Sequence, residues 1–509
     1  MPTVSVRQGT IRGLSVAADG SADDSGQLAA FFGIPYAAAP VGERLFLPPQ
    51  PAEWSGELDA TKRRATPPQI QYPEAALSIV ENPLVEGEDF LNLNVWVSKE
   101  VLEQGEAAKA PVYVFIHGGA YRNGSGSISQ LEGTGFAEKG IVAVTINYRL
   151  GVLGGLQLED GTSNNQLRDQ IAALEWVRDN IAAFGGDPEH VVVGGESAGA
   201  MSIGALLTSP KAKGLFHGAI LQSGAAHNSV SQEAARAVGR RYAEYVGLEP
   251  NAKSLGSLEP EKAFEAGAAV EQEISTSADK DTYFDLASNS MTWQPSVDGD
   301  VLPEHPIEAL KAGRGADVPV LIGTNLDEGT FFVVGTGIFD KVSDDDVKKA
   351  AAAWGAKDPE KVFELNVDSE DPRPGTTMVN LFHHWKFLQP LGQFIDARVE
   401  NSDGPTFRYR FDWKSPKFGG ALGSHHMLEI PFTFHTIDRQ AIKDTVDLDA
   451  PVQLADDVHG AWVSFIKDLN PGWDPHTTDS RPTGIFTAEG RRVDTDVDRQ
   501  AFVDWAGQR

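Results

Sequence analysis

The chain has 509 residues, of which 41% are hydrophobic, contains no cysteine and carries a formal net charge of −29 at pH 7. A chain of this length can bury a large core, and α/β folds with long insertions reach it as one domain. The negative charge argues against partners such as nucleic acid or an anionic membrane surface. The absence of cysteine excludes disulfides and a thiol nucleophile.

The sequence shows neither a secretion signal nor a membrane-spanning segment. The opening residues 1–6 run directly into an alternating, strand-like pattern and lack the basic start and apolar core of a secretion signal. No stretch approaches the roughly 20 apolar residues that a transmembrane helix needs. Zero cysteine also suits a reducing compartment. The sequence therefore predicts a cytoplasmic protein with no membrane partner.

Strands and helices are expected to alternate from about residue 90 to 225. The β-branched and aromatic runs 112–116 and 191–193 predict buried strands. Between them, apolar residues recur at helical spacing over 171–181, and Gly185-Gly186 predicts the end of that helix. This alternation is typical of βαβ units, so the predicted fold class is α/β, with a mostly parallel central sheet flanked by helices.

The second half of the chain is expected to add to the same domain, which spans residues 1–509. Acidic, alanine-rich helical segments at about 228–315 and 335–400 are predicted to be insertions that form walls above the active site. Ser343 followed by Asp346 predicts an N-terminal helix cap. The alternating residues 406–411 predict a late strand.

The most informative motif is Gly-x-Ser-x-Gly at 195–199. It follows a predicted strand and precedes an apolar stretch, 198–207, that is expected to be a helix. In this setting the motif is a nucleophile elbow, a strained turn that exposes the oxygen of Ser197 at the edge of the sheet. The amides at the start of the helix would then face the oxygen of a reacting carbonyl. The alternative is a glycine-rich turn with an inert serine.

A second glycine-containing segment, 117–121, follows the strand at 112–116. Hydrolases with a nucleophile elbow take a further oxyanion-binding amide from an HGGG-type loop at this place. The predicted oxyanion hole therefore consists of the backbone around Gly118, Gly119 and Ala120, together with Ala198. A merely flexible turn at the end of the strand is the alternative.

With these motifs in place, the chain resembles the type-B carboxylesterase family of α/β-hydrolases, and especially its bacterial p-nitrobenzyl-esterase-type members. The matching blocks occur in the family's order, at 32–44, 88–95, 147–151 and 169–188. The resemblance implies an α/β-hydrolase fold and ester hydrolysis. Phe90 stands where secreted members carry a cysteine, which also favours an intracellular form.

The resemblance implies the other catalytic residues. The family's acid is the Glu of an Asp-Glu-Gly motif, which is Glu328 here, while Asp327 is expected to be solvated. The family's histidine lies in a His-x-x-Glu pattern, which fits His426 with Glu429 and leaves His425 as the alternative. The order of Ser197, acid and histidine is then the one typical of α/β-hydrolases.

Two further residues receive supporting roles from the resemblance. Glu196 could tune the electric field around His426, or it could be the buried partner of an arginine. Ser223 could brace the histidine–acid pair, or it could be an ordinary turn serine.

Two ion pairs are expected to be structural: Arg44 with Glu88, and Arg149 with Asp169. The loop 163–170 departs from the family pattern, because Ser163 and Gln166 stand where glycines are usual. Its backbone is therefore expected to differ.

No cofactor and no metal are predicted. The adjacent histidine pairs at 383–384 and 425–426 lack ligand spacing, because neighbouring side chains on an extended chain point to opposite faces. The chain has no Walker A motif and no dinucleotide-binding glycine fingerprint.

The predicted function is hydrolysis of small to medium apolar or aromatic carboxylic esters through an acyl-enzyme. The expected substrate contacts are Tyr121, Phe331 and Phe332, and the partner is a small-molecule ester. No arginine can be assigned to the pocket, so neutral diesters are expected to be better substrates than monoesters with a free carboxylate. The alternatives are a carbamate or amide hydrolase with the same triad, and a non-catalytic binding protein. The protein is expected to be a monomer or a weak homo-oligomer.

Overall fold

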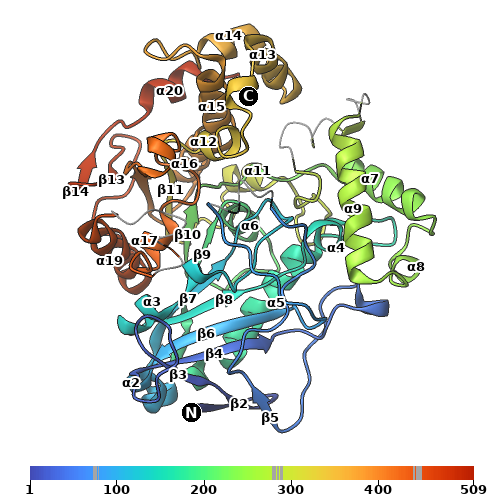
Figure 1. Ribbon diagram of the computed structural model, residues 1–509, viewed down its shortest axis with the longest axis vertical. Helices are drawn as coiled ribbons and strands as arrows, with labels where there is room; N and C mark the ends of the chain where they lie inside the picture. Colours follow the sequence, from blue (N-terminus) through green and yellow to red (C-terminus); the bar gives the residue numbers. More distant parts are fainter. Residues whose placement is uncertain are drawn as a thin grey trace.

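The computed structural model describes residues 1–72, 77, 79–277, 282–283, 286, 291–439, 442 and 450–508. Its centre is an 11-stranded sheet that crosses the molecule (Figure 1). In spatial order its strands are β14 (Gly490–Asp494), β13 (Thr483–Thr487), β12 (Thr406–Phe411), β11 (Val320–Asn325), β10 (Gly218–Gln222), β9 (Gly186–Glu196), β7 (Ala110–Ile116), β8 (Val142–Ile146), β6 (Asn92–Ser98), β4 (Leu28–Pro35) and β3 (Leu14–Val16).

The strands from β8 to β13 pair in parallel, and antiparallel pairs occur at the two edges of the sheet. Gly195 of β9 lies opposite Ile116 of β7 on one side and Leu221 of β10 on the other. In the same way, Gln222 pairs with Gly323 of β11. Because parallel strands end at the same edge, the loops after these four strands meet there. The α/β class and the mostly parallel sheet are confirmed.

A small sheet at the N-terminal end of the molecule lies apart from the large one, at the bottom of Figure 1. Its strands are β1 (Thr3–Val6), β2 (Gly9–Arg12) and β5 (Glu57–Asp59). β1 and β2 form an antiparallel hairpin, and β5 adds in parallel to β2.

The hydrophobic core has two layers because β7 alternates its side chains between the two faces of the sheet. Val112, Val114 and Ile116 belong to the cluster that contains the apolar residues of α5 (Asn165–Asn180) and α6 (Ala198–Leu206). Tyr113 and Phe115 belong to the cluster on the other face. That face is covered by α3 (Thr134–Glu138) and α19 (Val452–Asp468).

The helix predicted over 171–181 is α5, which continues into a 3-10 turn, Ile181–Phe184, and ends at Gly185 with φ of 86°. The predicted capping box is also confirmed: Ser343 and Asp346 exchange both hydrogen bonds at the start of α13 (Asp344–Ala353). Further helices of the fold are α4 (Gly151–Gly155), α7 (Gln232–Val246), α8 (Ala252–Leu255), α9 (Pro260–Ser275), α11 (Pro306–Lys311), α12 (Gly329–Val333), α14 (Pro359–Glu364), α15 (Pro374–His383), α16 (Gln389–Asn401), α17 (Ile430–Thr433) and α20 (Arg499–Asp504).

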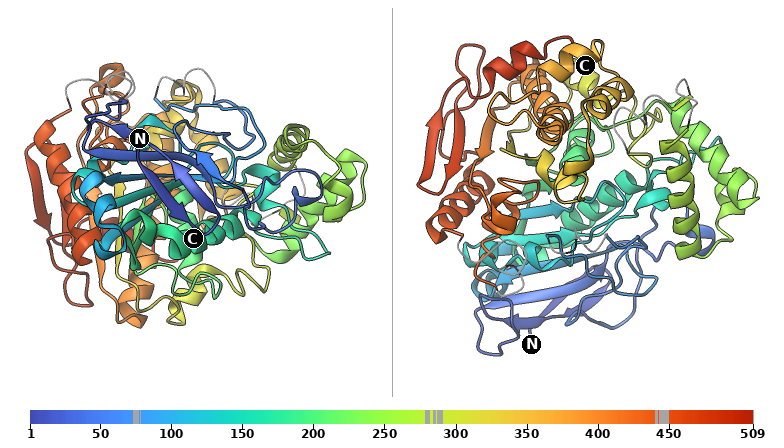
Figure 2. Two further views of the ribbon diagram at one scale, coloured as in Figure 1. Left: turned by 90° about the horizontal axis from the view of Figure 1, so that it is seen from below. Right: turned by 45° about the horizontal axis from the view of Figure 1, so that its top comes forward.

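Both segments predicted as insertions carry helices. The segment 228–315 contains α7, α8, α9 and α11, although its residues 278–281, 284–285 and 287–290 lie outside the described part of the chain. The segment 335–400 contains α13 to α16. In Figures 1 and 2 the green helices α7 to α9 project on one side of the molecule, and β13, β14 and α19 lie on the opposite side.

One of the two predicted ion pairs forms and the other does not. Arg149 and Asp169 are 2.7 Å apart with both side chains fully buried, as expected. The Arg44–Glu88 pair is absent from the described contacts, so that prediction is wrong. The reason is local, because Arg44 Nε donates to the carbonyl of Ala39 at 2.9 Å.

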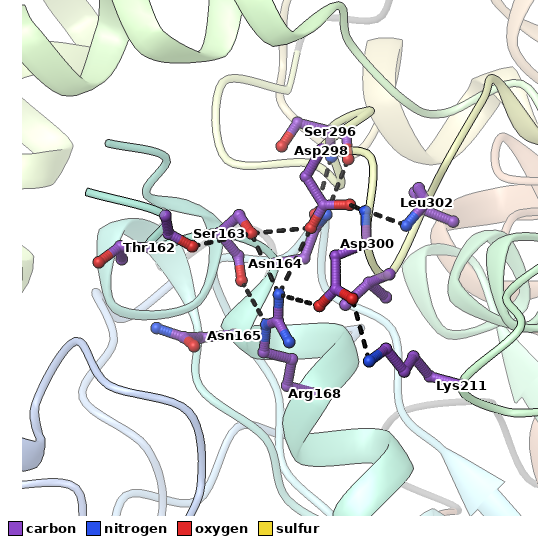
Figure 3. Close-up of polar contacts among 12 residues, drawn as sticks. Thr162, Ser163, Asn164, Asn165, Arg168, Lys211, Ser296, Asp298, Asp300 and Leu302 are labelled. Atoms are coloured by element: carbon purple, nitrogen blue, oxygen red, sulfur yellow. Dashed lines mark hydrogen bonds and ion pairs between the residues drawn. The ribbon is translucent and has the colours of Figure 1, made fainter. Parts of the chain in front are cut away.

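The loop that lacks the usual glycines makes its own set of polar contacts (Figure 3). Ser163 Oγ donates to Asp298 Oδ2 at 2.7 Å, and Asp298 Oδ1 accepts from the backbone N–H groups of Asp300 and Leu302, each at 2.9 Å. Arg168 lies 3.6 Å from Asp298. The hydroxyl that replaces a glycine therefore joins the start of α5 to the segment 298–302.

We expect Asp298→Ala to lower the midpoint of thermal unfolding by about 3 °C, because it leaves three donors and one guanidinium without their buried acceptor, a loss of about 3 kcal/mol. Asp300→Ala is the matched control. Asp300 also contacts Arg168, but its side chain is 48% exposed, so its loss should cost less than about 1 kcal/mol. Equal shifts in the two variants would show that the buried network does not hold this loop.

Candidate active site

Ser197 lies in the turn between β9 and α6, with φ of 53° and ψ of −123°. The two flanking glycines are required by close approach of the backbone. A Cβ at Gly199 would lie 2.0 Å from the carbonyl oxygen of Ile116, and one at Gly195 would lie 2.7 Å from the carbonyl carbon of Gly199. The motif is therefore a strained strand-to-helix turn at the carboxyl edge of the sheet.

Glu328 and His426 are in direct contact. His426 Nδ1 lies 2.5 Å from Glu328 Oε2. The second oxygen, Oε1, accepts from Ser223 Oγ at 2.5 Å and from the N–H of Asn325 at 2.7 Å. Burial alone would raise the pKa of Glu328, but His426 and these donors hold it below its ordinary value. Glu328 is thus a buried, ionised hydrogen-bond acceptor for the imidazole.

The other nitrogen of His426 points towards the elbow. His426 Nε2 lies 3.0 Å from Glu196 Oε1, but the two atoms are not aligned as a hydrogen bond, and Glu196 Oε1 has no such partner among the described residues. Within the described contacts, Ser197 Oγ also makes no hydrogen bond to His426. Burial would lower the pKa of His426, but Glu196 and Glu328 raise it above its ordinary value.

Two further glutamates share this buried region. Burial raises the pKa of Glu196 to about 8, and burial with the charge of Glu328 raises that of Glu429 to about 7. Glu429 accepts from the side chains of Gln222, at 3.1 Å, and Asn325, at 2.6 Å. One ionised carboxylate, Glu328, is therefore flanked by two that hold protons more readily.

The neighbouring His425 has different surroundings. Its Nδ1 lies 2.7 Å from the carbonyl oxygen of His426, and its Nε2 has no hydrogen-bond partner among the described residues. Burial lowers the pKa of His425 to about 4. His426, and not His425, is thus the histidine that contacts Glu328.

The loop after β7 has an unusual backbone. Gly119, Ala120 and Tyr121 have φ of 109°, 53° and 60°. In the described part of the chain, the backbone N–H groups of the loop residues Gly119 and Ala120, and of Ala198 at the start of α6, have no hydrogen-bond acceptor. Gly118 fits only without a side chain, because a Cβ there would lie 2.8 Å from the carbonyl oxygen of Glu196 and 3.0 Å from Ser197 Cβ. This geometry leaves amides free beside the elbow.

Aromatic rings surround the imidazole of His426. The ring centres of Phe331, Phe332 and Phe387 lie 5.9, 5.1 and 4.8 Å from it. Tyr121 differs from this group, because it is only 1% exposed and its hydroxyl lies 3.4 Å from Ser202 Oγ. Phe331 and Phe332 thus lie beside the imidazole, whereas Tyr121 is buried against Ser202.

The described residues contain no cluster of three or more potential metal ligands. Each described helix also falls short of the length and apolar character that a membrane span requires.

Comparisons with known proteins identify the family of this chain. The sequence profile of the carboxylesterase family matches residues 1–489. The chain belongs to the carboxylesterase family. It is 36% identical to the para-nitrobenzyl esterase of Bacillus subtilis over 90% of this chain and 91% of the relative, and 32% identical to the phenmedipham hydrolase of Pseudarthrobacter oxydans over 93% and 94%.

Solved carboxylesterase structures have the same fold. A thermophilic p-nitrobenzyl esterase aligns with a TM-score of 0.83 and 30% identity over 99% of both chains. A Geobacillus stearothermophilus carboxylesterase aligns with a TM-score of 0.82 and 31% identity, over 99% of this chain and all of its own. The protein is a carboxylic ester hydrolase with the α/β-hydrolase fold.

Sequence reasoning missed three residues of this carboxylesterase site. Asn325 donates through its side chain to the carbonyl of His425 and through its backbone to Glu328. Asp327, expected to be solvated, accepts from the N–H of Ser424 at 2.8 Å and so holds the start of the histidine loop. Their position in the motif around Glu328 was a usable signal. Arg122 had no such signal, and it lines a cavity next to the loop that follows β7.

Proposed function

We propose that the protein is a serine carboxylesterase in which Ser197 is the nucleophile, His426 the general base and Glu328 the residue that orients the imidazole. The contact between His426 Nδ1 and Glu328, at the same sheet edge as the Ser197 elbow, carries this proposal. Because Nδ1–H is donated to Glu328, Nε2 is the atom left to accept the proton of Ser197.

The reaction then runs in two halves. Ser197 Oγ attacks the ester carbonyl carbon while His426 Nε2 takes its proton, and the imidazolium returns that proton to the leaving alcohol. A water molecule, deprotonated by His426, next attacks the acyl-enzyme and releases the acid. Both halves require the neutral form of His426, whose pKa the neighbouring Glu196 and Glu328 raise above its ordinary value.

The free backbone amides support an oxyanion hole formed by Gly119, Ala120 and Ala198, with Gly118 giving the loop its close approach to Ser197. Backbone N–H groups that are already in position stabilise the negative charge on the oxygen of the tetrahedral intermediate without reorganisation. Ser223 and Glu196 support the pair, the first by its hydrogen bond to Glu328 and the second by its carboxyl group, which lies 3.0 Å from His426 Nε2.

The substrate class that fits the site best is a small to medium apolar or aromatic ester. Phe331 and Phe332 offer aromatic surface beside His426. We also propose that the chain is a single domain whose segments 228–315 and 335–400 wall the site. Phe387, from the second segment, and the α9 residues that line the neighbouring cavity support this.

The expected setting is a cytoplasmic enzyme that needs no cofactor and acts as a monomer or weak homo-oligomer. The absence of cysteine and the phenylalanine at position 90 support an intracellular form.

A substrate panel tests the reaction class. We expect the purified full-length protein to cleave p-nitrophenyl butyrate with a kcat/KM at least about tenfold above that for a p-nitrophenyl N-alkylcarbamate, and further above that for the matching p-nitroanilide, because the ester has the more reactive carbonyl; tenfold is about 1.4 kcal/mol of barrier. Release of p-nitrophenol or p-nitroaniline is the readout. A higher kcat/KM for the carbamate or the anilide would favour the alternative hydrolase.

A further inference from the structure

A cavity of about 350 Å³ lies beside the loop that follows β7. The apolar part of its lining comes from Val152 of α4, Phe264 of α9 and Trp293. The charged part is Arg122, which directly follows the loop residue Tyr121, and Glu271 of α9. The cavity therefore combines room for hydrocarbon with a cation–anion pair.

Arg122 is close to the nucleophile along the chain and in space. Its backbone N–H donates to the carbonyl of Gly119 at 2.9 Å, so the two residues close a turn whose ends are within about 7 Å. Gly118, at the start of this loop, approaches Ser197 so closely that a Cβ would lie 3.0 Å from that of the serine. Arg122, which lines the cavity, thus lies one turn away from the proposed oxyanion hole.

Tyr72 connects the cavity to the histidine. It lines the cavity and packs in the small hydrophobic cluster that also includes Phe331, the ring beside His426. Burial raises the pKa of the Tyr72 hydroxyl, and the charges of Glu196 and Arg122 both act on it. Tyr72 therefore links the lining of the cavity to the aromatic residues around His426.

The two charged residues of the cavity differ in exposure: Arg122 is accessible to solvent, whereas Glu271 is largely buried. The side chain of Arg122 is 49% exposed and that of Glu271 is 12% exposed. Their nearest atoms are 3.5 Å apart, and this is the only polar contact of the Arg122 side chain among the described residues. A full arginine–carboxylate pair makes two bonds of about 2.7–2.9 Å. Arg122 therefore keeps donors for a further acceptor.

We propose that this cavity receives a carboxylate carried by the ester substrate, and that Arg122 pairs with it. The preferred class is then the half-ester of a dicarboxylic acid, with its hydrocarbon part against Phe264 and Trp293. The proposal rests on the proposed esterase function, and it replaces the expectation that a free carboxylate is rejected.

The high negative charge of the chain, −29, does not outweigh this contact. Repulsion between exposed charges is screened over a Debye length of about 8 Å at physiological ionic strength. A direct pair in a cavity lined by apolar side chains is screened much less. Long-range charge thus slows the approach of an anion, while the local arginine decides its binding.

The first test compares two p-nitrophenyl esters: the half-ester of glutaric acid and its uncharged analogue, the ester of glutaric acid monoamide. We expect Arg122→Gln to lower the ratio of kcat/KM, charged over neutral, at least about tenfold, which is about 1.4 kcal/mol, mainly through KM. Arg492→Gln on β14, which removes the same charge from a 54% exposed side chain across the molecule, should leave the ratio unchanged. A ratio unaffected by Arg122→Gln overturns the proposal.

The second test does not depend on turnover. Calorimetric titration with phenylacetate and with phenylacetamide should show that Arg122→Gln weakens binding of the anion at least about tenfold and leaves that of the amide unchanged, with the same 1.4 kcal/mol equivalence. Equal binding of phenylacetate by wild type and variant overturns the anion site. If this dependence holds but neither ester is cleaved, the esterase proposal fails and the anion site stands.

Discussion

Ser197→Ala is expected to reduce kcat for p-nitrophenyl butyrate at least a thousandfold, about 4 kcal/mol of barrier, while the protein stays folded. The reason is that Ser197 carries the only hydroxyl group in the turn 195–199 between β9 and α6. An organophosphate should add its mass to the peptide that contains Ser197 in the wild type and leave the variant unlabelled. Intact-protein and peptide mass spectrometry read the result.

Ser209→Ala is the matched control. Ser209 is also buried, follows the same helix and uses its hydroxyl to reach the carbonyl of Val301 at 2.7 Å. Its loss should leave kcat within about threefold, because the hydroxyl is remote from the reacting atoms. If folded Ser197→Ala keeps more than about a thousandth of wild-type kcat, the acyl-enzyme mechanism through this serine is wrong.

The elbow could be predicted from sequence because its causes are local. A strand that ends in glycine, a serine in a strained turn and a helix of small residues occupy one continuous stretch, 191–207. The same holds for α5 and the cap of α13, where the spacing of apolar residues and one hydrogen-bonding pair decide the structure. Motifs whose stabilising contacts lie within one or two turns can be predicted from the sequence without knowledge of the fold.

Contacts between distant segments could be predicted only where a family pattern pointed to them. Glu328 and His426 are 98 residues apart, and no periodicity links them. The Arg44–Glu88 pair shows the limit, because Arg44 found a nearer acceptor in its own turn. Opposite charges in two motifs do not predict a pair unless the backbone brings them together.

The cavity with Arg122 was beyond sequence reasoning for a different reason. Arg122 reads as one exposed residue in a loop, and nothing in the sequence places α9 beside it. The pairing with Glu271 and the apolar lining arise only when a helix from the segment 228–315 packs against the loop after β7. Composition suggested repulsion of anions, whereas the proposal made above for this cavity rests on its local geometry.

The adjacent histidines provide the second large expected effect. His426→Asn should lower kcat at least a thousandfold, about 4 kcal/mol, and His425→Asn less than about tenfold. His426 lies between Glu328 and Glu196 and is the proposed acceptor of the nucleophile's proton. His425 reaches only a backbone carbonyl, which an asparagine amide can also satisfy. Steady-state kinetics on ester substrate, with thermal unfolding midpoints as the folding control, separates the two.

A double variant sharpens the assignment. Residues that act as one unit lose activity only once, so Ser197→Ala combined with His426→Asn should be little slower than either single variant. Combining Ser197→Ala with His425→Asn should be equally slow, because the remaining rate no longer depends on any general base. If His425→Asn is the more damaging single variant, the base is His425 and the contact between His426 and Glu328 is structural. If the fold losses in kcat of the two single variants at Ser197 and His426 multiply in the double variant, each residue acts alone and the proposed proton transfer between them is wrong.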